Sequence, residues 1–144
     1  MYIRLEQAQA IIAGALEYAA SNMMKPICVI VLDARGELKA AATMDEASLK
    51  RSSIARGKAD GALAMGVGSR SLFKRAKEQP FFISAATQAV GGSLVPVPGG
   101  VIVRDASGRT LGAVGVSGCT SDNDEAAALA GIASAGLIGD PGQD

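Results

Sequence analysis

The stretch Ile27-Cys28-Val29-Ile30-Val31-Leu32-Asp33-Ala34-Arg35-Gly36 decides the fold. Its first six residues form a continuous, β-branched-rich apolar run, which is typical of a central strand covered on both faces. Asp33 to Gly36 is turn chemistry, because Gly36 can take the positive φ that closes a hairpin. A second strand is indicated by alternating apolar residues at Leu38, Ala40, Ala42 and Met44. The stretch therefore predicts an antiparallel hairpin.

Outward from this hairpin, helical patterns precede and follow it. Apolar spacing predicts helices over residues 5–19, 48–65 and 69–77, and an Ala-rich helix from about Asp122 to Leu137, with Asp122 as N-cap and Glu125 at N3. Residues 78–92, which contain Pro80 and a Gly-Gly pair, favour a folded-over loop. Three further strands are predicted at 94–97, 100–104 and 109–117, and the last two are joined by Asp105-Ala106-Ser107-Gly108, which repeats the first turn.

Hairpin-type links favour an α+β fold with about five mostly antiparallel strands and the N- and C-terminal helices packed on the sheet. We expect a single domain over residues 1–144, with residues 138–144 as a frayed tail. No Gly-x-Gly-x-x-Gly or phosphate-loop pattern follows a strand, which argues against a nucleotide-binding parallel sheet.

The composition restricts partners and chemistry. Fourteen basic residues balance fourteen acidic ones, so a nucleic-acid or anionic-membrane partner is not expected. We predict a cytoplasmic protein, because no spanning helix or signal peptide is visible and two cysteines do not form a disulfide framework. The chain has no histidine, which removes the usual general base and the commonest metal ligand.

Several motifs in order along the chain resemble the GlcG/HbpS family, the DUF336 or heme-degrading-domain-like proteins related to the C-terminal domain of PduO-type proteins. They are the hairpin of residues 29–38, Met44-Asp45, Lys58-Ala59, Pro98-Gly99-Gly100-Val101 and Gly112-Ala113-Val114-Gly115-Val116-Ser117-Gly118. The resemblance covers residues 5–138. It implies a profilin-like fold and a homo-oligomer, with an octamer as one candidate size. Cys119 departs from the family pattern, in which glycine is frequent at this position.

Ser117-Gly118-Cys119 leads from the last long strand into the last helix. Unpaired N–H groups and the helix dipole favour an anion there. In the alternative reading, Asp122 and Glu125 satisfy those N–H groups themselves. Cys119 is the candidate nucleophile, since a helix N-terminus lowers the pKa of a thiol.

Other candidate residues come from distant segments. The Gly99-Gly100 turn can present N–H groups to a ligand or can simply join two strands. Asp45 and Lys58 can meet as a buried pair or as ligand contacts, and Arg51 lies on the same helix face as Lys58. We therefore predict a metal-free site in which Asp45, Glu125 and Cys119 are catalytic and Arg51, Lys58, Gly99, Gly100, Ser117 and Gly118 bind the substrate.

Three functions remain open at this stage. The first is a catabolic protein that binds a small organic acid and acts as a hydrolase of imine- or enamine-type intermediates, with a carboxylate as general base. The second, implied by the family, is a heme or corrinoid binder, although the lack of histidine argues against this cofactor and we expect none. The third is a non-catalytic assembly module in which glycine and alanine faces join subunits.

Overall fold

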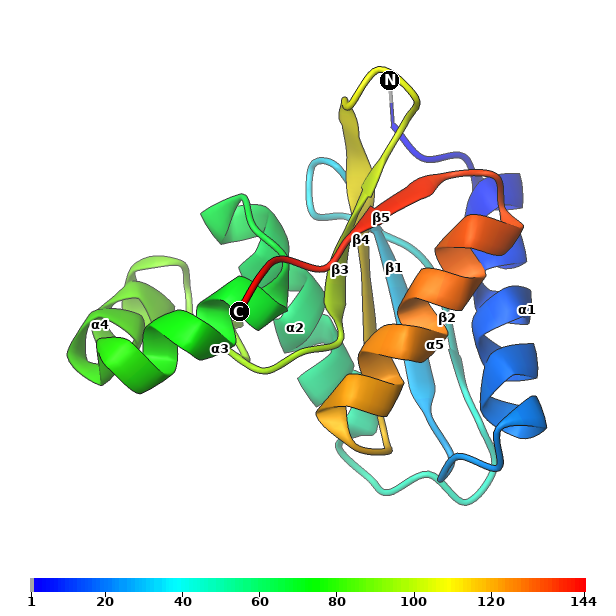
Figure 1. The fold of residues 1–144 in the computed structure, drawn as a ribbon, viewed down its shortest axis with the longest axis horizontal. Coiled ribbons are helices and arrows are strands. Elements are labelled where there is room, and N and C mark those ends of the chain that lie inside the picture. The colour runs from blue at the N-terminus through cyan, green and yellow to red at the C-terminus, as the bar shows by residue number, and fades with distance from the viewer. Residues whose placement is uncertain (1) are drawn as a thin grey trace.

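The computed structural model describes residues 2–144, which form an antiparallel sheet between two layers of helices (Figure 1). The elements in chain order are α1 (Leu5–Ser21), β1 (Cys28–Asp33), β2 (Leu38–Thr43), α2 (Arg51–Met65), α3 (Ser69–Glu78), α4 (Pro80–Ala89), β3 (Gly100–Arg104), β4 (Thr110–Ser117), α5 (Ser121–Ser134) and β5 (Ile138–Asp140). Within the described residues, the five strands lie in the order β2-β1-β4-β3-β5 and every neighbouring pair is antiparallel. The predicted α+β class is confirmed.

The predicted hairpin forms β1 and β2. All six residues of β1 are buried, because helices cover both of its faces. Val29 and Val31 point toward α1 and α5, whereas Cys28, Ile30 and Leu32 belong to a smaller cluster beneath α2. The alternation of a central strand thus divides the apolar run between two cores. The first and last long helices pack on the sheet, as predicted.

Small residues let α1 and α5 approach each other closely. A Cβ atom at Gly131 would overlap the carbonyl oxygen of Ile11, and one at Gly14 would overlap the hydroxyl of Ser134. Ala8 and Ala15 of α1 and Ala127 and Ala128 of α5 are buried in the same core. These glycine and alanine faces are therefore occupied within the chain and are not free for contacts between subunits. Subunit contacts through these particular faces are therefore not expected, and the assembly module stays a prediction.

Four details differ from the sequence-based expectations. Residues 80–89 form the helix α4 rather than a loop, with Pro80 at its first turn. Residues 94–97 lie outside the sheet: the N–H of Val95 donates to the carbonyl of Gly57 at the edge of α2. The fifth strand is instead β5, which pairs with β3, so residues 138–140 are ordered and not frayed. The N-cap of α5 is Thr120, whose hydroxyl accepts the N–H of Asn123, and not Asp122.

Helices α3 and α4 form a hairpin that projects away from the sheet (Figure 1). We call residues 69–89 the arm. Its apolar interior consists of Leu72 and Ile83 packed with Leu94, a cluster separate from the two cores beside the sheet. None of the helices in residues 2–144 is long and apolar enough to cross a membrane.

Candidate functional site

Lys58 lies inside the molecule between α2 and β4. Its side chain is 2% exposed, and Nζ donates to the carbonyl oxygen of Val116 at 2.9 Å and to Oδ2 of Asp124 at 3.2 Å. Gly99 makes room for it, because a Cβ atom there would lie only 2.8 Å from Nζ. Burial lowers the pKa of Lys58, and the nearby carboxylate of Asp124 partly opposes that shift.

The buried partner of Lys58 is Asp124, on the first turn of α5, and not Asp45. Asp45 is exposed in the turn that follows β2. Both oxygens of Asp124 are used, since Oδ1 accepts the backbone N–H of Cys119 at 2.9 Å. Asp124 therefore links α2 to the segment between β4 and α5. At this helix N-terminus Thr120 and Asp124 accept N–H groups. Asp122 and Glu125, which the sequence suggested for this role, pair with Arg70 instead.

Arg51, Ser117 and Gly118 are brought together, as the sequence predicted they could be. The guanidinium of Arg51 donates to the buried hydroxyl of Ser117 at 3.3 Å and to the hydroxyl of Ser48 at 2.9 Å. A surface pocket of about 190 Å³ opens beside them. We call it the Arg51 pocket; its lining residues are Lys25, Pro26, Glu46, Ala47, Ser48, Arg51 and Gly118. Two cations and one carboxylate face this pocket, which suits a ligand with a carboxylate group.

Cys119 follows the pocket residue Gly118 and is partly buried. The side-chain amide of Asn123 donates to its sulfur at 3.4 Å, and this contact is the main reason that the pKa of the thiol is lowered. The backbone N–H groups of Lys25 and Thr120 act in the same direction, against the effect of partial burial. The pKa of the Cys119 thiol is thus lowered, and this residue directly follows Gly118 of the Arg51 pocket.

The other predicted residues lie elsewhere or are already bonded. Glu125 pairs with Arg70, at 3.0 Å from its Nε, and takes no part in the Arg51 pocket. The N–H of Gly100 donates to Ser69 Oγ at 2.7 Å, so the Gly99-Gly100 turn has no free Gly100 donor for a ligand. The sequence placed Ser69 at the start of a helix, which is where α3 begins, but it did not indicate this contact with Gly100.

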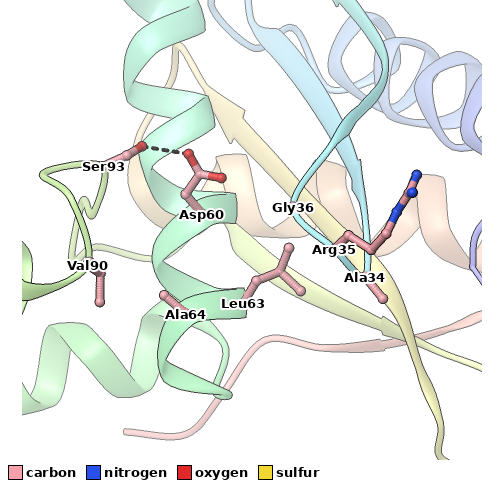
Figure 2. A pocket seen from close by; sticks show the side chains of 8 residues that line it. All are labelled: Ala34, Arg35, Gly36, Asp60, Leu63, Ala64, Val90 and Ser93. Carbon is pink, nitrogen blue, oxygen red and sulfur yellow. Dashed lines mark hydrogen bonds between the residues drawn. The ribbon is translucent and has the colours of Figure 1, made fainter.

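A second, larger pocket of about 390 Å³ contains none of the predicted residues. It lies between the β1–β2 turn, α2 and the segment after α4 (Figure 2). Asp60 accepts the hydroxyl of Ser93 at 2.7 Å and the guanidinium of Arg56 at 3.1 Å. The Arg35 guanidinium points away from Asp60 (Figure 2) and pairs with Asp33 at 2.8 Å. Each charged group that lines this pocket, Arg35 and Asp60, is thus already paired with an oppositely charged side chain of this chain.

A five-stranded antiparallel sheet with α1 and α5 on one face and α2 on the other defines an α+β protein, with a surface pocket near the end of β4. The family model described as haem degrading protein HbpS-like matches residues 3–133. The chain therefore belongs to the HbpS-like family, and the resemblance noted in the sequence is confirmed. No curated protein matches it.

Solved structures agree with this assignment. The complex of PduOC with heme is similar over 95% of this chain and 97% of its own, with 25% identity and a TM-score of 0.84. A double mutant of Streptomyces reticuli HbpS covers 92% of this chain and 86% of its own at 27% identity, with a TM-score of 0.78. Klebsiella pneumoniae ORFY, a DUF336 protein, has a TM-score of 0.83 over 93% and 90% of the two chains at 24% identity, and supports the fold alone.

The expectation that no cofactor is involved needs correction. A related structure was solved as a heme complex, and the family is described as haem-degrading. The expectation was based on the absence of histidine, yet heme iron is also bound by cysteine, methionine and tyrosine side chains in proteins. The absence of one ligand type is therefore too weak an argument against the cofactor.

Proposed function

We propose that this chain binds heme at a shallow site beside Cys119 and that a second copy of the chain completes this site. The observation that carries the proposal is the similarity to the PduOC–heme complex over 95% of the chain. Two features of the chain support this location: a sulfur donor with a lowered thiol pKa and an adjacent pocket with two cations.

The donor chemistry fits a heme. Thiolate is one of the ligand types of heme iron, and Cys119 is the partly exposed cysteine, since Cys28 is buried in β1. Lys25 and Arg51 carry the charges that propionate groups need, and each charge-assisted contact contributes about 1.5–3 kcal/mol. When bound, heme would supply an iron centre, and these residues of the chain would hold the macrocycle and set its orientation.

The dimensions indicate a shared site. Ligand pockets usually enclose roughly 300–1,000 Å³, whereas the Arg51 pocket has a volume of about 190 Å³. One copy can hold an edge of the macrocycle with its propionates, and the remaining apolar surface needs another cover. This argument supports a homo-oligomer.

A hemin titration followed by absorbance tests the proposal. We expect a Soret band that saturates with the wild-type chain and changes position in Cys119→Ser, because the sulfur that would hold the iron is then missing. Arg51→Ala should weaken binding about tenfold, which corresponds to about 1.4 kcal/mol. Arg109→Ala, an exposed cation on the β3–β4 turn, is the matched control and should bind hemin as the wild type does.

Iron-free protoporphyrin separates the two parts of the site. Its binding should be weakened by Arg51→Ala and left unchanged by Cys119→Ser, because it has no metal to coordinate. A wild-type chain that shows only non-saturating hemin absorbance would contradict the proposal. An unchanged Soret position in Cys119→Ser would refute the assignment of the iron ligand alone.

A second candidate is the binding of a small organic acid, as part of a hydrolase for imine- or enamine-type substrates. The volume and the cations of the Arg51 pocket favour it, and exposed Asp45 follows β2 directly before the pocket residue Glu46. A 2-oxo acid such as pyruvate should then raise the melting temperature of the wild type and not of Arg51→Ala. If pyruvate has no effect and hemin binds, this candidate is wrong.

A further inference from the structure

The arm carries an unusual concentration of aromatic and basic side chains. All three phenylalanines of the chain lie on it: Phe73 on α3, and Phe81 and Phe82 on α4. Two of the rings are stacked against cations, Phe82 with Arg75 and Phe73 with Lys77. Phe81 is 74% exposed and belongs to neither of the large cores.

Helix α4 also presents an uncharged outer face. Its sequence, PFFISAATQA, contains no charged residue. Buried Ile83 and Ala86 face the arm's interior, whereas exposed positions recur at Phe81, Ala85 and Gln88. Spacings of four and three residues place these positions on one side of the helix. An exposed face of this kind is typical of a helix that docks into another protein.

The charges indicate which partner fits. The arm, residues 69–89, contains four basic residues (Arg70, Lys74, Arg75 and Lys77) and one acidic residue, Glu78. The whole chain has fourteen of each kind, so the remainder contains ten basic and thirteen acidic residues. The body of a second copy therefore has the charge that complements the arm, whereas two arms facing each other would bring like charges together.

Unpaired acids mark a receiving surface on that body. Asp45 and Glu46 are adjacent and exposed, and neither forms an ion pair within residues 2–144. Glu46 also lines the Arg51 pocket, which lacks an apolar cover. The arm of the same copy projects from α2 away from the sheet (Figure 1), so a cover for this pocket has to come from another molecule.

We propose that the arm of one copy docks against the Asp45–Glu46 segment of a second copy and brings Phe81 over its Arg51 pocket. The contact is head-to-tail, because the arm and the receiving segment are different surfaces, and repeated contacts of this kind close into a ring when the rotation allows it. The proposal deepens the proposed function by naming the partner surface of the shared site, and its role as a heme cover rests on that function.

Light scattering after gel filtration, without heme, tests the docking. The wild type should be an oligomer at micromolar concentration, and Phe81→Ser and Lys74→Glu should each weaken self-association about tenfold or more. Leu5→Ser, an apolar residue that is 52% exposed on α1, and Arg109→Glu are the matched controls and should keep the wild-type mass. Thermal melts followed by circular dichroism check that each variant is folded.

A charge exchange identifies the receiving segment. Asp45→Lys should weaken the assembly, and Lys74→Glu combined with Asp45→Lys should restore it. A monomeric wild type would overturn the docking, and so would a monomer that instead binds vesicles of anionic lipid. An unchanged oligomer mass in both Phe81→Ser and Lys74→Glu would also overturn it. Arm variants that become monomers and still bind hemin like the wild type would support the docking and contradict the shared heme site.

Discussion

Asp124 and Glu125, adjacent at the start of α5, pair with cations in different surroundings: one pair is buried and the other is partly exposed. Asp124 is paired with Lys58 at 3.2 Å, and both side chains are 2% exposed. Glu125 is paired with Arg70 at 3.0 Å, where the two side chains are 13% and 20% exposed. Arg70 also contacts Asp122 and Asp144, which are almost fully exposed. One pair is sealed in the interior, and the other belongs to a surface cluster.

The difference shows that the exposure of an ion pair to water determines how much the pair contributes to stability, because burial removes the hydration of both charges. Burial lowers the pKa of Lys58 despite Asp124, because desolvation of the ammonium outweighs the attraction. In the surface cluster, the carboxylates of Glu125, Asp144 and Asp122 raise the pKa of Arg70 with little desolvation to oppose them. We therefore expect large effects where one member of the buried pair is removed and smaller, salt-sensitive effects in the cluster.

The largest effect is expected for Lys58→Ala. It would leave Asp124 buried without its cation, and the free energy of unfolding should fall by about 3–5 kcal/mol. Urea denaturation measures this value. Lys50→Ala, an exposed lysine just before α2, is the control and should change stability little. A loss below about 1 kcal/mol for Lys58→Ala would mean that the pair is not a structural element.

A double-mutant cycle sharpens the same point. Lys58→Met and Asp124→Asn should each be destabilising, because each leaves one unpaired charge in the interior. The double variant removes both charges, and an asparagine oxygen can still accept the N–H of Cys119. We expect an interaction energy of about 1–3 kcal/mol from unfolding of the four proteins. Additive losses would show that Lys58 and Asp124 act independently.

Arg70→Met should have an intermediate effect. Loss of the cation from a half-buried cluster should reduce the free energy of unfolding by about 1–2 kcal/mol, between the ranges for exposed and buried pairs. The difference from the wild type should shrink at high salt, since the partners face solvent. Arg109→Met provides a control with a fully solvated cation. If the loss of unfolding free energy does not depend on salt, the ion pairs of Arg70 behave like the buried Lys58–Asp124 pair and not like solvent-exposed pairs.

The smallest effect is expected for Asp144→Asn, and its sign depends on pH. Arg70 lowers the pKa of Asp144 in the folded chain. The folded form then binds fewer protons than the unfolded form, so the stabilisation is present above the ordinary aspartate pKa and is lost as the pH falls through the lowered value. Thermal melts should show a small deficit for the variant near neutral pH and none in acid. A deficit that persists in acid would contradict the ion pair.

The sequence predicted the fold well where local chemistry and burial agree. The turn at Asp33 and the turn at Asp105 have the same spacing, and each aspartate accepts the N–H groups two and four residues ahead. Helix α4 was missed because Pro80 was taken as a loop signal, although proline is also favoured at the first position of a helix. The segment 94–97 has strand-like residues, but it packs beside α2. This placement depends on tertiary contacts, which the local sequence pattern does not reveal.

The candidate site was harder to predict. Lys58 forms a buried pair, which is one of the two readings that the sequence left open, but its partner is Asp124 on α5 rather than Asp45 after β2. The sequence alone does not show which of these distant segments lies next to Lys58. Arg51, Ser117 and Gly118 do meet, because the end of β4 and the start of α2 lie together in the fold. Their roles as ligand contacts, and that of Cys119, remain predictions for the hemin titration.

The close packing of α1 against α5 has a consequence for folding kinetics. Gly14 and Gly131 lie together although most of the chain separates them, and β1 pairs with β4 over a shorter but still long span. The entropy of closing such long loops is lost before these contacts stabilise the chain. We expect the chain to refold over milliseconds to seconds, slower than a helical bundle of the same length.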